Sequence, residues 1–216
     1  MNIFGYNTNG PNAKSIYLSM RSTSSFAFSL IITYELVYHT IEIGLSPMQL
    51  VTVGVILECM TLFFEIPTGT IADSYSRRLS IIGGYFLIGV GFLIEGLFAT
   101  FFAVILAQVL WGIGFTFYSG AGDAWIADEV GTEKASQLYL RGTQLSQVMS
   151  LIGVAVGAFT VEFGLKWPII LGSTIYLVMV PILMWYMSET GFTPSAVFST
   201  QDLYKNTLTQ FNKSIQ

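Results

Sequence analysis

Five acidic side chains interrupt long apolar stretches of this sequence, and their positions are the best suited to chemistry. They are Glu35, Glu58, Glu65, Glu95 and Asp123. A charge at the centre of a lipid bilayer costs about 2.5–3.5 kcal/mol on insertion scales, so such residues tend to mark a path for ions or solutes. A buried carboxyl group can also bind and release a proton. The alternative for each residue is a structural carboxylate held by hydrogen bonds.

Glu58 is the deepest of these residues, because it lies near the middle of its apolar stretch. Glu65 belongs to the same stretch and lies seven residues further on, which puts both side chains on nearly one face of a helix. We therefore place Glu58 first among the candidates for a proton or substrate path. For Glu35, Glu65, Glu95 and Asp123, which are nearer the ends of their stretches, the structural role is favoured.

A second group of charged residues directly follows the stretch that contains Glu65. Residues 69–78 read GTIADSYSRR, so Asp73 precedes Arg77 and Arg78 by four and five residues. This spacing lets the carboxylate reach a guanidinium group, and Gly69 lets its helix approach a neighbour closely. Such a cluster can latch two segments together. It also fits an ordinary basic loop that fixes the orientation of a membrane protein.

Enzyme chemistry is not supported by the remaining motifs. Residues 120–123 read GAGD and match the G-x-G-D element of intramembrane aspartyl proteases, but the Tyr-Asp pair that supplies their second carboxylate is absent from the sequence. A rhomboid serine protease would need a Gly-x-Ser-Gly motif and a histidine deep in another helix. Ser119 follows Phe117 and Tyr118 instead, and the single histidine, His39, lies at the outer end of the first apolar stretch. The one cysteine, Cys59, can form neither an internal disulfide nor a metal cluster. We predict no enzyme activity, no cofactor and no metal site.

The composition shows which elements must position these residues. Of 216 residues, 53% are hydrophobic and only 10% are charged, and the mean hydropathy is +0.64. These values indicate a membrane protein rather than a soluble domain, and we expect no nucleic-acid partner. The apolar runs are long and lack the alternating polarity of barrel strands. Helices are therefore expected, since a helix satisfies its own backbone hydrogen bonds in lipid.

Six apolar stretches have roughly the 20 residues that a helical span requires. They are residues 17–40, 47–70, 79–99, 102–125, 143–164 and 167–187. If the amino terminus is cytoplasmic, eight of the nine Lys and Arg residues face the cytoplasm and only Lys166 faces outward. We predict six spans with both termini in the cytoplasm, residues 1–16 forming the amino-terminal segment. Residues 188–216 are predicted to form a cytoplasmic linker, with apolar residues at loose helical spacing between 203 and 215.

The segment after the second stretch resembles a loop motif of the major facilitator superfamily. The family pattern G-x-x-x-D-[RK]-x-G-[RK]-[RK] is matched at four positions, while two serines stand where the family has a basic residue and a glycine; the matches are Gly69, Asp73, Arg77 and Arg78. Residues 65–68, 119–129 and 140–144 are also similar to bacterial members. The resemblance covers residues 17–190. It implies an all-α fold, the amino-terminal six-helix half of a transporter, built as two inverted three-helix repeats.

The resemblance also implies a role for Asp73. In the family the loop aspartate is thought to engage a helix of the second half in one state and to release it in the other. The gating loop would then consist of Gly69, Asp73, Arg77 and Arg78.

Two departures argue against drug–proton antiport. Gln108 precedes Gly112 where the antiporter groups usually have an arginine, and residues 150–157 contain no proline. Gln108 therefore joins the acidic residues as a candidate for the substrate or proton path. Gly153 and Gly157 are predicted to pack against a neighbouring helix, because small residues four apart allow close approach.

Together these features predict a transporter in the plasma membrane of a bacterium that moves a small solute by alternating access; no motif specifies the substrate. Alternating access needs two halves around one site. We expect either a truncated or half-length chain, or a half that pairs with a second six-helix half or with another copy of itself. The alternative function is a six-span scaffold or accessory protein without transport of its own.

Overall fold

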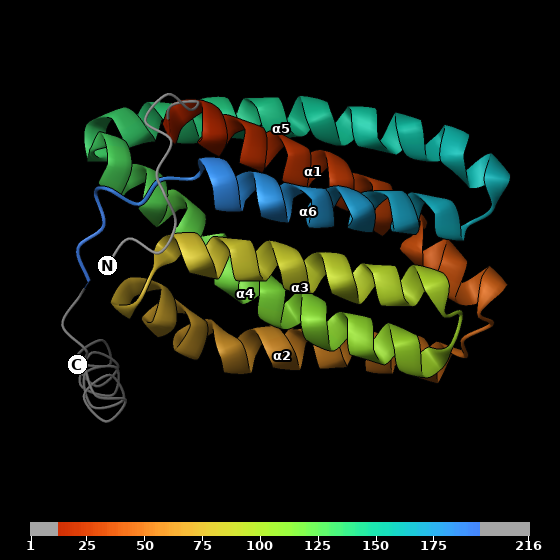
Figure 1. Cartoon of the computed structure of the whole chain (residues 1–216). Helices are drawn as coiled ribbons and strands as arrows, with labels where there is room; N and C mark the ends of the chain where they lie inside the picture. Colours follow the sequence, from red (N-terminus) through yellow and green to blue (C-terminus); the bar gives the residue numbers. More distant parts are fainter. Residues whose placement is uncertain (1–12, 195–216) are drawn as a thin grey trace, which may run out of the picture.

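The computed structural model describes residues 13–194, and all regular structure in this range is helical. Six long helices run side by side (Figure 1). Their bounds are α1 Ala13–Val37, α2 Pro47–Ser74, α3 Arg77–Leu97, α4 Phe101–Val130, α5 Thr132–Thr160 and α6 Lys166–Tyr186. A π-helical turn, η1 (Tyr38–Glu42), extends α1, and a 3₁₀ turn, η2 (Val161–Phe163), follows α5. Residues 1–12 and the predicted apolar segment 203–215 lie outside the described range.

Five of the helices in this range are long and apolar enough to cross a membrane, namely α2 to α6. α1 is not among them, because Arg21, Glu35 and several serines and threonines interrupt its apolar residues. The prediction of six crossings is therefore not confirmed, although six long helices are present. Several polar side chains of α1, including Ser24, Ser29 and Glu35, are buried against other helices. A helix placed in this way needs less apolar surface than one that faces lipid.

Local sequence sets the helix ends. The Ser46 backbone N–H donates to Gln49 Oε1 at 2.9 Å while Ser46 Oγ accepts from the Gln49 backbone, a capping box that starts α2 at Pro47. Ser76 and Thr100 cap α3 and α4 through their hydroxyl oxygens. The end of α3 at Leu97 and the Thr100 cap confirm the predicted division between the third and fourth helices near residue 100.

Several helices continue beyond the predicted apolar stretches. α5 begins at Thr132, well before residue 143, and its first turns bury Ala135, Leu138 and Gly142 while their other faces are polar and exposed. An amphipathic segment of this kind escapes a search for continuous apolar residues. Gly131, with φ of +85°, separates α4 from α5 in a conformation that suits glycine.

The helices pack in the order α5, α1, α6, α3, α4, α2 across the bundle. α3 lies inside the bundle: 61% of its most apolar 18-residue segment is buried. The buried share of the corresponding segment is 6% in α2 and 11% in α5. The predicted packing of Gly153 and Gly157 is confirmed: a Cβ atom on Gly153 would lie 2.5 Å from the Phe26 carbonyl oxygen of α1, and one on Gly157 would meet the Tyr34 ring. α2 and α5 form the outer edges of the bundle (Figure 1). Both leave long apolar faces exposed.

Candidate functional site

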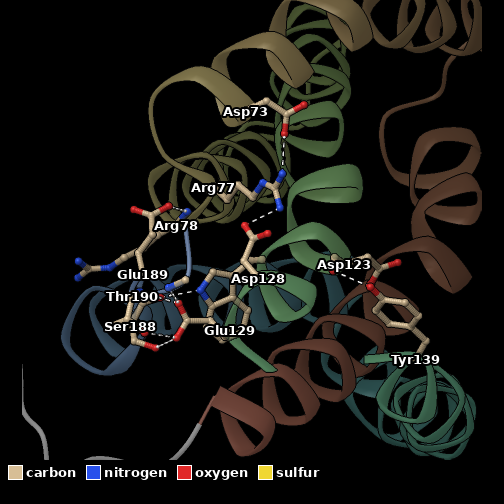
Figure 2. A network of polar contacts seen from close by, with 12 residues as sticks. Asp73, Arg77, Arg78, Asp123, Asp128, Glu129, Tyr139, Ser188, Glu189 and Thr190 are labelled. Carbon is tan, nitrogen blue, oxygen red and sulfur yellow. Dashed lines mark hydrogen bonds and ion pairs between the residues drawn. The ribbon is translucent and has the colours of Figure 1, made fainter. Parts of the chain in front are cut away.

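The turn between α2 and α3 forms an ion-pair network with the end of α4 (Figure 2). Arg77 Nη2 lies 3.2 Å from Asp73 Oδ1, and Arg77 Nη1 donates to Asp128 Oδ2 at 2.6 Å. The Arg77 side chain is 18% exposed, the Asp73 side chain 52%. Arg77 therefore bridges two helices through carboxylates that solvent reaches, an arrangement whose partners can be exchanged at low energetic cost. The Asp73–Arg77 contact expected from the sequence spacing is present.

Residues 188–191, which follow α6, are hydrogen-bonded to neighbouring residues of the same network (Figure 2). The Glu129 carboxylate accepts hydrogen bonds from the Ser188 and Thr190 hydroxyls and from two backbone N–H groups, those of Thr190 and Gly191. Glu189 accepts from the Ser76 hydroxyl at 2.7 Å and from the Arg78 backbone N–H at 3.0 Å. The start of the predicted linker is therefore held against α4 and the α2–α3 turn.

Asp123 lies deeper along α4 and joins a second polar group. Its Oδ1 accepts from the Tyr17 hydroxyl at 2.6 Å and lies 3.9 Å from Arg21 Nη1, while its backbone oxygen accepts from Tyr139 at 2.8 Å. Asp123 thus connects α4 to α1 through its carboxylate and to α5 through its backbone oxygen. The side chain is 46% exposed, so solvent reaches it.

Arg21 also borders a cavity of about 700 Å³ between α1, α4 and α5, with single contributions from α3 and α6. Its lining combines hydroxyl groups, one amide and aromatic rings: Ser24, Ser25, Ser29, Thr143, Ser146, Gln147, Ser150, Phe28, Trp111, Phe115, Tyr118 and Tyr176. This volume is in the range that holds a small organic molecule. Thr143, Gln147 and Leu151 line it and are exposed, so the cavity has an open rim along α5.

Hydrogen bonds and ring contacts hold much of the lining in place. The Ser24 and Tyr176 hydroxyls lie 3.0 Å apart, and Ser146 donates to the Arg21 backbone oxygen at 3.2 Å. The Trp111 ring packs between those of Phe28 and Phe92, at centroid distances of 5.5 and 5.2 Å. Such groups can orient a solute by hydrogen bonds on one side and by ring contacts on another.

The other end of the bundle contains a buried polar group. Gln108 Nε2 donates to Glu35 Oε1 at 2.8 Å, which joins two residues that the sequence analysis proposed separately for the path. His39 Nε2 lies 2.8 Å from Glu95 Oε1 and 3.9 Å from Glu35 Oε1. Glu35, His39, Glu95 and Gln108 are all buried. None of them lines the cavity.

Glu58 and Glu65 lie on the exposed surface of α2. The predicted shared face is therefore present, but neither side chain lines the cavity, and their role on a path stays a prediction. Gly69 is also exposed, and a Cβ atom there would meet nothing within 4 Å. The close helix approach expected at Gly69 therefore does not occur among the described residues.

Sequence reasoning missed the partners contributed by the end of α4. In the sequence, Asp128 and Glu129 stand out only as members of residues 119–129, which are similar to bacterial superfamily members. In the structure Asp128 binds Arg77 and Glu129 binds residues 188–191. The signal was available, because alternate connections of a helical bundle lie at the same end of the bundle. Acidic residues at the end of the fourth helix are therefore expected near the basic residues that follow the second. The serines and Gln147 of the cavity carried no comparable signal, because single polar residues are common in helices.

Two comparisons relate the chain to known proteins. Residues 15–211 match the sequence profile of the family described as Major Facilitator Superfamily. Over 142 residues the chain is 25% identical to the uncharacterized MFS-type transporter YxaM of Bacillus subtilis (strain 168). That stretch is 66% of this chain and 34% of the relative. The chain therefore spans about a third of the length of the curated protein it matches.

Proposed function

The chain belongs to the major facilitator superfamily and is an integral, multi-pass membrane protein, and from this we propose that it is the amino-terminal half of a secondary transporter. It would carry a small solute by alternating access, with the solute bound between this half and a second one. The second half is either part of a longer polypeptide or a partner chain, and a second copy of this chain is one such partner.

The cavity between α1, α4 and α5 is the observation that carries this proposal. It is about 700 Å³ in volume, has a mixed polar and aromatic lining and an open rim. A second half placed over α2 and α5 would cover their apolar faces and close the rim. The one charged residue of the lining is Arg21, which lies near Asp123. We therefore assign the cavity to a neutral or singly negative solute with an apolar part.

The network at the α2–α3 turn would serve as the cytoplasmic gate. Arg77 holds Asp73 and Asp128 together in this structure, and the exposed Asp73 carboxylate remains within reach of a second half. This proposal places residues 13 and 194 on the cytoplasmic side of a plasma membrane. Reporter tags fused at Ser76 and at Leu165 should then appear on opposite sides, and tags in the same compartment would contradict the orientation.

Thiol labelling tests whether the cavity is a water-filled solute site. In a Cys59→Ala background, Gln147→Cys lies in the cavity lining, whereas Val148→Cys is the next residue of α5 and lies outside the lining at the same depth. A water-soluble maleimide should react with the first variant many times faster than with the second, because thiolates form in water. Equal rates would contradict the assignment.

Flux measurements test transport itself. Vesicles that contain the chain with its second half should take up at least one member of a panel of labelled sugars, amino acids and organic anions. Trp111→Ala and Gln147→Ala should reduce this uptake, whereas Phe163→Ala, on an exposed turn outside the cavity, should not. Glu58→Gln should abolish uptake only if Glu58 couples transport to protons. Absence of flux for the whole panel would favour the scaffold function.

A further inference from the structure

Glu35, His39 and Glu95 place three metal-binding atoms together at the end of the bundle opposite the α2–α3 turn. One ligand atom from each residue lies within 4.8 Å of the other two. Glu35 and His39 are one helical turn apart on α1 and η1, and Glu95 comes from α3. The π-helical turn that carries His39 is a local departure from α-helical geometry, of the kind often found at functional sites.

The cluster is closed to solvent and places two carboxyl groups beside one imidazole. The side chains of Glu35, His39 and Glu95 are 8%, 4% and 0% exposed. Among residues 13–194 no Lys or Arg lies within ion-pair distance of either carboxylate, and Lys166, near this end, is exposed. Two buried carboxylates next to one imidazole carry up to two negative charges, and such charges are costly unless a cation pairs with them.

Glu95 supplies a second, independent indication. Its Oε1 contacts His39, but its Oε2 is buried and has no hydrogen-bond partner among the described residues. Buried carboxylate oxygens in native proteins nearly always have a partner, so an orphaned one needs an explanation such as an ion. Glu35, in contrast, is oriented by the Gln108 amide at 2.8 Å.

From this geometry we infer that Glu35, His39 and Glu95 bind one divalent transition-metal ion of the Zn²⁺ or Mn²⁺ class. One imidazole and two carboxylates suit these ions, and two carboxylates neutralise a 2+ charge. Tetrahedral bonds of about 2.0–2.2 Å separate ligand atoms by about 3.3–3.6 Å. The His39–Glu95 pair, now 2.8 Å apart, would open slightly, and the 3.9 Å His39–Glu35 pair would close.

Gln108 would act on the metal indirectly. Its amide from α4 holds one Glu35 oxygen, which is how outer-shell partners orient metal-binding groups. The bound ion would therefore fasten α1 and η1 to α3, with α4 in support. This inference goes beyond the proposed transport function and does not depend on it, because the cluster does not line the cavity.

Metal binding is tested on the whole 216-residue chain in detergent, purified without a histidine tag and stripped with a chelator. Zn²⁺ is added alone, and bound metal is measured after gel filtration together with the thermal midpoint Tm. We expect about one Zn²⁺ per chain, a rise in Tm and loss of both effects in His39→Gln and Glu95→Gln. Gln108→Ala should bind about 10-fold to 100-fold more weakly.

Glu162→Gln is the matched control, because this exposed carboxylate follows α5 at the same end of the bundle; it should bind Zn²⁺ like the unchanged chain. If the cluster variants do not fold, X-ray absorption of the Zn²⁺-loaded unchanged chain decides. One imidazole and carboxylate oxygens around the ion would support the site. An unchanged chain that binds no Zn²⁺ or Mn²⁺, binding through sulfur, or equal binding by the folded cluster variants would overturn it.

Discussion

The two ends of this helix bundle each bring two carboxylates to one basic side chain, but they do so in different surroundings. At the α2–α3 turn the Asp73, Asp128 and Arg77 side chains are 52%, 25% and 18% exposed. At the opposite end the side chains of Glu35, Glu95 and His39 are nearly inaccessible, with no value above 8%.

The difference shows how burial changes what a contact between polar side chains contributes. Water screens the exposed group, so its pairs are weaker than buried ones and can be exchanged as helices move. The buried group has no water to replace a lost partner, so each of its members depends on the others. A movable contact is therefore expected at the first end and a fixed one at the second.

The largest expected effect is at the buried end. In chelator-treated protein, His39→Leu leaves the two carboxylates without their basic neighbour and should lower the free energy of unfolding by about 3 kcal/mol. Denaturant unfolding in detergent, followed by tryptophan fluorescence, measures this value. The double variant His39→Leu/Glu95→Leu removes one of these two carboxylates and should be clearly more stable than His39→Leu alone. Equal stability of the two variants would show that no buried charge is left uncompensated.

An intermediate effect is expected at the α2–α3 turn. Arg77→Gln removes two charge-assisted contacts of a side chain that is only partly exposed, and should cost about 2 kcal/mol. Adding Asp128→Asn to Arg77→Gln should cost little more, since the two residues share one interaction. Fully additive losses in the same unfolding assay would argue that the Arg77–Asp128 contact contributes nothing.

The smallest effect is expected for the pair between Arg21 and Asp123. The atoms are 3.9 Å apart and the side chains are 29% and 46% exposed, so Arg21→Gln should cost less than about 1 kcal/mol. The cost should shrink further in 1 M salt, which screens exposed charges. Tyr17→Phe is the comparison, because it removes the 2.6 Å hydrogen bond to the same carboxylate and should depend little on salt. A large loss of stability for Arg21→Gln that does not change with salt would show that this pair behaves like the buried contacts at the other end of the bundle.

Much of the fold follows from the sequence. Long apolar stretches with charges between them predicted the helices and their division, and the superfamily resemblance is confirmed by the match over residues 15–211. The first helix is the exception: its predicted membrane crossing is not confirmed, because polar residues, several of them buried against other helices, interrupt its apolar residues.

The sites were less predictable, because they depend on which helix faces join. The four-residue spacing in the sequence predicted the Asp73–Arg77 contact. No local pattern brings Glu95 to His39, 56 positions away, or Gln108 to Glu35, 73 positions away. The sequence did place Glu35, His39 and Glu95 near one side of the membrane. It did not reveal their proximity, and for that reason no metal site was expected from it.

The attachment of residues 188–191 has a mechanical consequence. Glu189 bonds the residues that begin α3, and Glu129 and Trp125 of α4 hold the neighbouring positions. Polypeptide that continues past residue 194 therefore departs from an anchored point rather than swinging from the last turn of α6. A displacement of residues 188–191 would therefore be transmitted to Ser76, Arg78 and Glu129, the chain neighbours of Arg77 and Asp128.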